Sequence, residues 1–293
     1  MLFNNFNRMR TYDEMLHHLI KEALAEDIGD GDHSTLCCIE KAASGKAVLK
    51  IKQNGILAGV GVAEKIFKMV EPSSVFNAIK ADGEGMKYGE IAFTVSSSIQ
   101  TILQCERLVL NIMQRMSGIA TLTHQYSSLL KGYHSKILDT RKTTPNFRLL
   151  EKEAVRIGGG HNHRFALYDM IMLKDNHIDF CGGIEKAIEK AWQYTVDLKP
   201  GLKIEVETRS LEDVEKVIAV GEGKVLRIML DNFTTDLISE ALKLINGRFE
   251  TEASGRINLD NIVEYAKTGV DYISVGALIH QAKSLDLSLK AEV

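Results

Sequence analysis

The spacing of apolar residues divides the chain into two parts with different patterns. From Tyr12 to Asp27, apolar residues recur at intervals of three and four, which predicts an amphipathic helix. Strand-like runs follow at 47–52, 75–80 and 91–99, and a helical stretch at 62–70 lies among them. This order predicts a small α+β unit rather than a train of βαβ units.

A regular alternation of strand, loop and helix occupies the second half of the chain. Short apolar runs predict strands at residues 136–138, 168–173, 202–206, 225–230, 249–253 and 271–275. Helical segments follow the first five of these runs, which predicts a parallel sheet that closes toward a barrel. The expected fold is therefore α/β, with an N-terminal α+β sandwich domain followed by an incomplete, TIM-like parallel barrel of about six strands.

The expected domain boundaries follow from this change of pattern. Residues 1–116 would form the sandwich domain, and residues 117–280 would form the barrel domain. Residues 285–290 alternate between apolar and polar as an exposed strand does. We therefore expect the tail, 281–293, to pack back on the first domain.

Composition and charge exclude several classes of function. The 293 residues are 45% hydrophobic and 26% charged, with a net charge of -3 and a pI near 6.3, so a basic nucleic-acid-binding surface is not expected. The 4 cysteines have no C-x-x-C spacing, which argues against zinc ribbons and disulfide frameworks and favours a reducing cytoplasm. No signal peptide and no apolar run of roughly 20 residues is found, so no membrane partner is expected.

Charged and small residues follow each predicted strand of the second half. The positions are Asp139-Thr140-Arg141-Lys142, Lys174-Asp175, Glu207, Asp231-Asn232, Ser254-Gly255 and Gly276. Because the carboxyl ends of parallel barrel strands meet at one face, we expect these side chains to lie close together. Each alone could be a helix cap or an exposed strand end. Their common position after successive strands favours a functional site.

The densest group of cations lies in the segment from the end of the first predicted barrel strand to just past the second. The residues expected in loops are Arg141, Lys142, His161, His163, Arg164, Lys174 and His177. Such cations would bind an acidic, planar or phosphorylated small molecule. The His-x-His pair could hold a metal, but no third His or Cys has suitable spacing, which favours imidazole as a hydrogen-bond donor.

A helix is expected to separate these loop cations. Thr144 and Pro145 would cap and begin it, and Gly158 would end it. Its charged residues are expected on the solvent face; they are Arg148, Lys152 and Arg156.

Carboxylates and glycines complete the candidate site. Glu207 and Asp231, from neighbouring strands, are the hard oxygen ligands that Mg²⁺ uses beside bound phosphates. Glu205 shares a strand face with Glu207 and is a weaker second candidate. Ser254-Gly255 and Gly276 end the last two strands, where barrels commonly bind phosphate through backbone N–H groups.

Longer stretches of the chain resemble one known family. The runs DTRKTTP, AVRIGGGHNHRFALYDMIMLKDNHI, IEVE, IMLDNF, EASG and DYISVGAL are similar to the quinolinate phosphoribosyltransferases, also called carboxylating nicotinate-nucleotide pyrophosphorylases. The resemblance extends over nearly the whole chain, from ALAEDIGDGDHST to LDLSLK, and its central segment is far more specific than a short glycine motif.

The resemblance implies both an activity and a set of site residues. The subunit would work with Mg²⁺ in NAD biosynthesis, as a homodimer or higher even oligomer with the active site at the subunit interface. Its small-molecule partners would be quinolinate and phosphoribosyl pyrophosphate, held by Arg107, Thr140, Arg141, Lys142, His163, Arg164 and Lys174. The resemblance assigns Glu207 and Asp231 to the ribose and the metal, and the 5′-phosphate to Ser254, Gly255 and Gly276. The catalytic residues implied are Lys142, Lys174, Glu207 and Asp231.

Arg107 lies in a segment, 102–116, whose apolar residues leave little polar face. We expect this helix to be buried, and a buried arginine needs an anion. In the resembled family that anion would be the substrate of the neighbouring subunit. A structural pair with another carboxylate remains the alternative.

The chain departs from the family pattern at a few positions. Ser97-Ser98 stands where the family commonly has Gly-Pro, and Asn146 where it commonly has Gly. The segment 220–225 belongs to a stretch somewhat longer than usual. None of these residues is proposed to bind a substrate or a metal. The departures therefore affect the expected shape of the loops rather than the expected reaction.

Other functions stay open at this point. A Schiff-base aldolase would use Lys142 or Lys174 as its amine, since both follow barrel strands. A related phosphoribosyltransferase with a different acceptor base, or one for nicotinate without decarboxylation, would need a differently sized pocket. A non-catalytic domain that binds a phosphorylated metabolite would leave Glu207 and Asp231 without a role.

Overall fold

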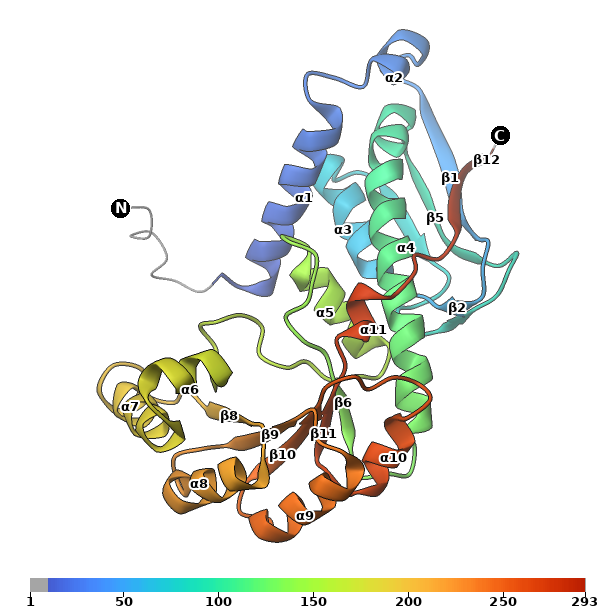
Figure 1. Cartoon of the computed structure of the whole chain (residues 1–293). Helices are drawn as coiled ribbons and strands as arrows, with labels where there is room; N and C mark the ends of the chain where they lie inside the picture. The colour runs from blue at the N-terminus through green and yellow to red at the C-terminus, as the bar shows by residue number, and fades with distance from the viewer. Residues whose placement is uncertain (1–9, 293) are drawn as a thin grey trace. The chain divides into compact units, whose positions relative to one another are not determined.

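The computed structural model describes residues 10–292, which form two compact units (Figure 1). The first unit comprises the described residues up to Leu122, Thr143–Gly158, and the described residues from Gln281 onward. The second comprises Thr123–Lys142 and Gly159–His280. The segment Thr143–Gly158, which the sequence boundaries placed in the barrel domain, thus clusters with the first unit.

The first unit is built on an antiparallel sheet with the strand order β12-β1-β5-β3. Its strands are β1 (Ser44–Ile51), β3 (Val75–Ala78), β5 (Ile91–Ser98) and β12 (Leu287–Glu292), and a separate short pair joins β2 (Gly55–Ile56) to β4 (Gly85–Met86). The helices are α1 (Tyr12–Ile28), α2 (His33–Cys38), α3 (Val60–Val70), α4 (Ile99–Leu129) and α5 (Arg148–Ile157). Leu289 of β12 pairs with Leu49 of β1, so the C-terminal strand joins this sheet.

Aromatic rings fill the space between α3 and the sheet. Phe67 of α3 lies with its ring centroid 6.4 Å from that of Phe93, and Phe76 lies 4.4 Å from Phe93. Phe67 and Phe93 are fully buried. Burial of such large side chains is the main stabilising contribution of a core, at about 25 cal/mol per Å² of apolar surface.

Helix α4 runs without a break through the expected domain boundary at residues 116 and 117. Its apolar residues Val109, Ile112 and Met113 are buried, as the sequence indicated. Arg107, however, is exposed. The expectation of a buried arginine is therefore wrong within this chain, because the apolar stripe covers one side of α4 and leaves Arg107 on the other.

Helix α5 differs from its prediction at both its start and its surface. It begins at Arg148 rather than Pro145, because Asn146 adopts a φ of 61°, which no α-helix contains. Thr144 does not cap the helix; its backbone N–H and its hydroxyl both donate to the carboxylate of Glu151. Gly158 does end the helix, as predicted.

The α5 face that was expected to meet solvent is partly buried. Lys152 is buried, and so is its neighbour Glu151, whose carboxylate accepts two hydrogen bonds from the guanidinium of Arg115. Arg115 also donates to the backbone carbonyl of Ala282. A charged residue can enter the interior when it is paired in this way, which the period of the helix alone does not reveal.

The second unit contains the predicted parallel sheet. In the described chain its strands are β6 (Lys136–Leu138), β7 (Ile171–Leu173), β8 (Ile204–Thr208), β9 (Arg227–Asp231), β10 (Glu250–Ser254) and β11 (Tyr272–Ser274). They follow the order β6-β11-β10-β9-β8-β7, with β6 and β7 at the two edges. The helices are α6 (Asp175–Cys181), α7 (Ile184–Asp197), α8 (Leu211–Gly221), α9 (Thr235–Ile245), α10 (Ile262–Lys267) and α11 (Ala277–His280). The predicted α/β class and incomplete barrel are confirmed.

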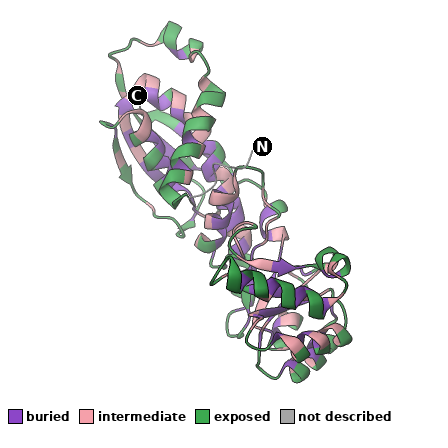
Figure 2. Cartoon of the chain, turned by 90° about the vertical axis from the view of Figure 1, so that its left-hand side faces the viewer, coloured by how far each residue is buried: buried purple, intermediate pink, exposed green. Residues whose placement is uncertain are grey.

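The parallel sheet forms the buried core of the second unit. The central strands are mostly buried, whereas the outer faces of the covering helices are exposed (Figure 2). Strand β9 reads Arg-Ile-Met-Leu-Asp, with all but the last residue buried. Such a continuous buried run is typical of a parallel strand covered on both faces.

Two further features of residues 10–292 concern membrane-spanning helices and the cysteines. No helix within residues 10–292 combines the length and apolar character needed to span a bilayer. Cys37, Cys38, Cys105 and Cys181 are all free thiols.

Candidate active site

A cavity of about 450 Å³ opens at the carboxyl ends of the parallel strands. Most of the residues predicted from sequence line it: Thr140, Arg141, Lys142, His163, Arg164, Lys174, Glu207, Asp231 and Ser254. Asp175, which was also expected at this face, lines it too. Further lining residues, not singled out for this site by sequence, are Met172, Met229, Glu252 and Ser274. The loops after β6 and β7 and the ends of β8 to β11 thus converge as the barrel prediction required.

Some predicted residues lie outside this lining. Arg107 belongs to the first unit. Gly276 lies beside the lining, because a Cβ built on it would approach Lys142 Cδ to 3.1 Å. His161 is exposed, and its backbone bridges to Leu138 of β6. His177 is not in a loop: it lies in the first turn of α6, where its ring accepts the backbone N–H of Lys174.

The cavity presents several cationic groups. Arg141 has a buried Nε with no hydrogen-bond partner within residues 10–292. Burial and the neighbouring charge of Arg141 lower the pKa of Arg164, whose Nη1 donates to the carbonyl of Met170. Lys174 is half-exposed. Like charges held together with an unused N–H donor indicate a site for an anion that carries more than one acceptor group.

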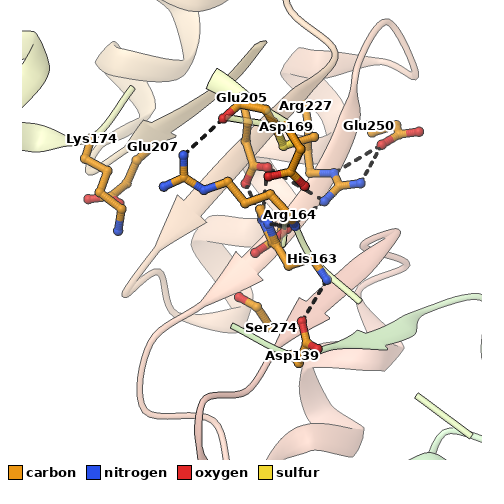
Figure 3. Close-up of polar contacts among 12 residues, drawn as sticks. Asp139, His163, Arg164, Asp169, Lys174, Glu205, Glu207, Arg227, Glu250 and Ser274 are labelled. Carbon is orange, nitrogen blue, oxygen red and sulfur yellow. Dashed lines mark hydrogen bonds and ion pairs between the residues drawn. The ribbon is translucent and has the colours of Figure 1, made fainter. Parts of the chain in front are cut away.

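Two carboxylates face the same cavity from neighbouring strands. Glu207 of β8 and Asp231 of β9 both line it, and the Nζ of Lys174 lies 3.5 Å from Glu207 (Figure 3). Burial raises the pKa of Glu207, Lys174 opposes this, and the charge of Asp231 raises it further. Two carboxylates that repel each other in a partly buried site are suited to a cation, either a metal or a developing positive charge on a ligand.

Beneath the cations lies a buried group of charged residues that we call the floor cluster: His163, Glu205, Arg227 and Glu252. His163 Nε2 lies 3.1 Å from a carboxylate oxygen of Glu205 and 3.3 Å from one of Glu252. Burial alone would lower the pKa of His163, but hydrogen bonds to the two carboxylates raise it to about 9. Figure 3 shows Arg227 extending from this cluster to Glu250.

Sequence reasoning ranked Glu205 low and did not consider Glu252 or Arg227. Glu205 does share its strand face with Glu207, but it points into the floor cluster and is fully buried. Glu252 lies in the EASG run, two residues before Ser254 on the same strand face, so the period-two rule could have placed it at the cavity. No comparable signal marks Arg227, because its partners come from other strands.

The turn that ends β10 depends on a glycine. Gly255 has a φ of 104°, and a Cβ built on it would lie 2.4 Å from Asn232 Oδ1 and 2.9 Å from the backbone nitrogen of Asn232. Asn232 in turn donates from its side chain to Asp231 at 2.6 Å and from its backbone to the carbonyl of Ser254. A side chain at Gly255 would therefore displace the end of β9 that carries Asp231.

Gly255→Ala is expected to reduce both stability and turnover. The left-handed backbone alone costs about 1–2 kcal/mol for an L residue, and the contact with Asn232 adds to it. Gly247→Ala is a matched control, since Gly247 also has a positive φ, 70°, but nothing lies within 4 Å of its Cβ position. Urea unfolding and kcat should separate the two: equal effects of both substitutions on kcat would show that the Asn232 contact is unimportant.

A second, larger cavity lies at the opposite ends of the strands. Its volume is about 840 Å³, and its lining includes Trp192, Lys203, Arg248 and Glu250. Residues at the amino-terminal face of parallel barrels contribute to stability rather than to chemistry. We therefore assign the candidate site to the smaller cavity, where the cations and the carboxylate pair meet.

Family models match both parts of the chain. The model described as quinolinate phosphoribosyl transferase, N-terminal domain, matches residues 32–117, and the corresponding C-terminal domain model matches residues 119–290. The chloroplastic nicotinate-nucleotide pyrophosphorylase (carboxylating) of Oryza sativa subsp. japonica is 43% identical over 299 residues, covering 96% of this chain and 78% of that protein. A probable enzyme of the same name from Synechocystis is 42% identical, with 92% and 90% covered.

Solved structures agree with these sequence matches. The crystal structure of NadC from Streptococcus pyogenes superposes with a TM-score of 0.88 at 39% identity, covering 98% of this chain and 100% of that one. The similarity therefore includes both units and the strands that build the cavity. The chain belongs to the quinolinate phosphoribosyltransferase family.

Proposed function

We propose that the protein transfers the phosphoribosyl group of phosphoribosyl pyrophosphate to quinolinate with decarboxylation, giving nicotinate mononucleotide, pyrophosphate and CO₂ in NAD biosynthesis. The observation that carries this proposal is the meeting of four cationic side chains and two carboxylates in one cavity; the residues are Arg141, Lys142, Arg164, Lys174, Glu207 and Asp231. Both substrates are polyanions, and their reaction creates a positive charge, so a site of mixed sign suits them.

The cations bind and orient the two anions. Arg141 and Arg164 are suited to the two carboxylates of quinolinate, because a guanidinium pairs a carboxylate through two parallel N–H bonds. Lys142 and Lys174 act as point charges toward the diphosphate. Neutralising the leaving pyrophosphate and aligning the ring nitrogen with the anomeric carbon lower the barrier without a protein nucleophile.

The carboxylates act on the sugar. Displacement of pyrophosphate passes through an oxocarbenium-like state, whose positive charge Glu207 and Asp231 would stabilise. The same pair suits Mg²⁺, which typically binds through one or two carboxylates and substrate oxygens, and which when bound would neutralise diphosphate charge. After transfer, the bond between the ring and the carboxylate beside the nitrogen breaks and CO₂ leaves. The electron pair stays on that ring carbon, stabilised by the adjacent cationic nitrogen, until a proton from water takes its place.

The oligomer and its location belong to the same proposal. A homodimer would let Arg107, exposed on α4, meet the substrate of the partner subunit. A cytoplasmic location would suit four free cysteines.

A direct assay tests the reaction. The protein, quinolinate, phosphoribosyl pyrophosphate and Mg²⁺ should yield nicotinate mononucleotide by mass spectrometry, together with trapped CO₂. Nicotinate, with one carboxylate fewer, should be a poorer substrate by roughly 10- to 150-fold, because a lost charge-assisted contact costs about 1.5–3 kcal/mol. Equal turnover of the two acids would contradict the proposal.

The alternative functions give different results in the same experiments. A Schiff-base aldolase would be trapped by borohydride with a carbonyl substrate at Lys142 or Lys174. A metabolite-binding domain would bind phosphoribosyl pyrophosphate without releasing pyrophosphate.

A further inference from the structure

The floor cluster is built from strands that lie beside one another in the barrel. Glu205 comes from β8, Arg227 from β9 and Glu252 from β10, and His163 enters from the loop between α5 and β7. Glu205 and Glu252 have no exposed surface, and the side chain of His163 is only 5% exposed. Of these four residues, His163 and Glu252 reach the lining of the cavity.

The spacing of the cluster resembles a metal site, and a guanidinium lies beside its two carboxylates. Ligand atoms of His163, Glu205 and Glu252 lie within 4.8 Å of one another. Arg227 Nη1 lies 2.9 Å from Glu252 and 3.8 Å from Glu205, and its guanidinium stacks 4.0 Å from the ring of Tyr272. This guanidinium supplies one positive charge beside the two buried carboxylates and so gives the cluster a structural counter-charge.

Both ring nitrogens of His163 are used inside the protein. Nε2 faces Glu205 and Glu252, and Nδ1 accepts the backbone N–H of Arg164 at 2.7 Å. Nδ1 accepts this hydrogen bond only in the neutral ring, whose one proton then lies on Nε2, toward the carboxylates. Protonation of Nδ1, which the raised pKa of His163 favours, would break the contact with Arg164. The ring therefore works as a link between the carboxylates and the backbone of Arg164.

The backbone of His163 is fixed as well. Its N–H donates to Asp139 Oδ1 at 2.8 Å, and Asp139 is fully buried at the end of β6. The ring orientation and the backbone position together determine where the chain places Arg164. The guanidinium of Arg164 lines the cavity, with Nη1 3.1 Å from the carbonyl of Met170.

We propose that Glu205 and Glu252 are positioning residues, which hold the His163 ring so that its Nδ1 fixes the backbone of Arg164 and presents that guanidinium to the acidic acceptor. The inference rests on the proposed function, in which Arg164 pairs a carboxylate of quinolinate. It predicts a selective defect: binding of the acceptor acid should weaken, while binding of the phosphoribosyl donor should change little. A merely structural contribution would weaken both.

A double-mutant cycle tests this link. Quinolinate and phosphoribosyl pyrophosphate affinities would be measured by calorimetry for the wild type, Glu252→Gln, Arg164→Ala and the double variant. Glu252→Gln should weaken quinolinate binding by roughly ten-fold, the loss of one charge-assisted hydrogen bond, and should leave the donor affinity within about two-fold. In the Arg164→Ala background, Glu252→Gln should have almost no further effect, because the two residues act through one contact.

Glu250→Gln is the matched control. Glu250 also binds Arg227, with Oε2 2.9 Å from Nη2, but it lines the cavity at the opposite ends of the strands. Its substitution should leave both affinities unchanged. Thermal melting would verify that each variant is folded, and Glu205→Gln would replace Glu252→Gln in the cycle if that variant fails to fold.

The outcomes separate this inference from the proposed function. Wild-type protein that does not bind quinolinate would contradict the proposed function itself. Wild-type protein that binds quinolinate, with additive losses in the double variant, or with equal losses for both ligands, would overturn the positioning role and leave the function intact.

Discussion

Glu207→Gln and Asp231→Asn are each expected to lower kcat by about 10²- to 10³-fold, the usual effect of removing one preorganised group that stabilises charge in a transition state. Both substitutions are nearly isosteric and remove only the negative charge. Quinolinate binding should survive, because the cations that hold the acid are untouched. Steady-state kinetics with saturating Mg²⁺ and calorimetry with quinolinate would measure the two effects separately.

The pH dependence gives a second readout for Glu207. Burial, together with the charge of Asp231, raises the pKa of Glu207. A group with a raised pKa takes up its proton at higher pH, so wild-type kcat should fall on acidification before an ordinary glutamate would be protonated. Glu250→Gln should leave this profile unchanged. If Glu207→Gln retains wild-type kcat, the residue has no role at the sugar.

Arg107→Ala and Lys174→Ala are each expected to abolish most activity alone, and a mixture of the two is expected to recover part of it. In a homodimer whose sites are shared, a mixed dimer holds one intact site and one doubly damaged site. Random 1:1 mixing should therefore restore roughly one quarter of wild-type sites. Activity after subunit exchange, with exchange verified by mass, is the measurement.

The exposed position of Arg107 makes this experiment informative. Arg107 has solvent access on α4 of its own chain, as a residue that meets another subunit requires. If no activity is recovered although subunit exchange is verified, Arg107 acts within its own subunit or is only a surface residue.

Local sequence patterns predicted most of the helices and strands, because these depend mainly on residues that are close to one another in the chain. The predicted α1 at 12–27 is observed at Tyr12–Ile28, and the strand predicted at 136–138 is observed there. The strand predicted at 168–173 is shorter, since Asp169 accepts the backbone N–H groups of Phe165 and Ala166 and forms a turn instead. Apolar periodicity cannot register such a competing side-chain contact.

The cavity was predictable for a different reason. Parallel strands bring their carboxyl ends to one face, so chemistry-bearing residues that follow successive strands must meet there. Arg141, Lys174, Glu207 and Asp231 are therefore expected to lie together, and they line one cavity. Strand order alone does not determine which of the two glutamates on one strand face, Glu205 or Glu207, is buried. Glu205 was therefore predicted as a second metal ligand, whereas it belongs to the floor cluster.

The sequence by itself determined the class of fold, the order of the elements and the face at which the charged residues gather, because these depend on periodicity and chain direction. Tertiary structure alone decided the pairings among distant residues: Arg227 with Glu252, Arg115 with Glu151, and β12 with β1. A buried charge is stable only where a partner from another element meets it, and no local pattern encodes that meeting. The burial of Lys152 and the exposure of Arg107 are both opposite to expectation.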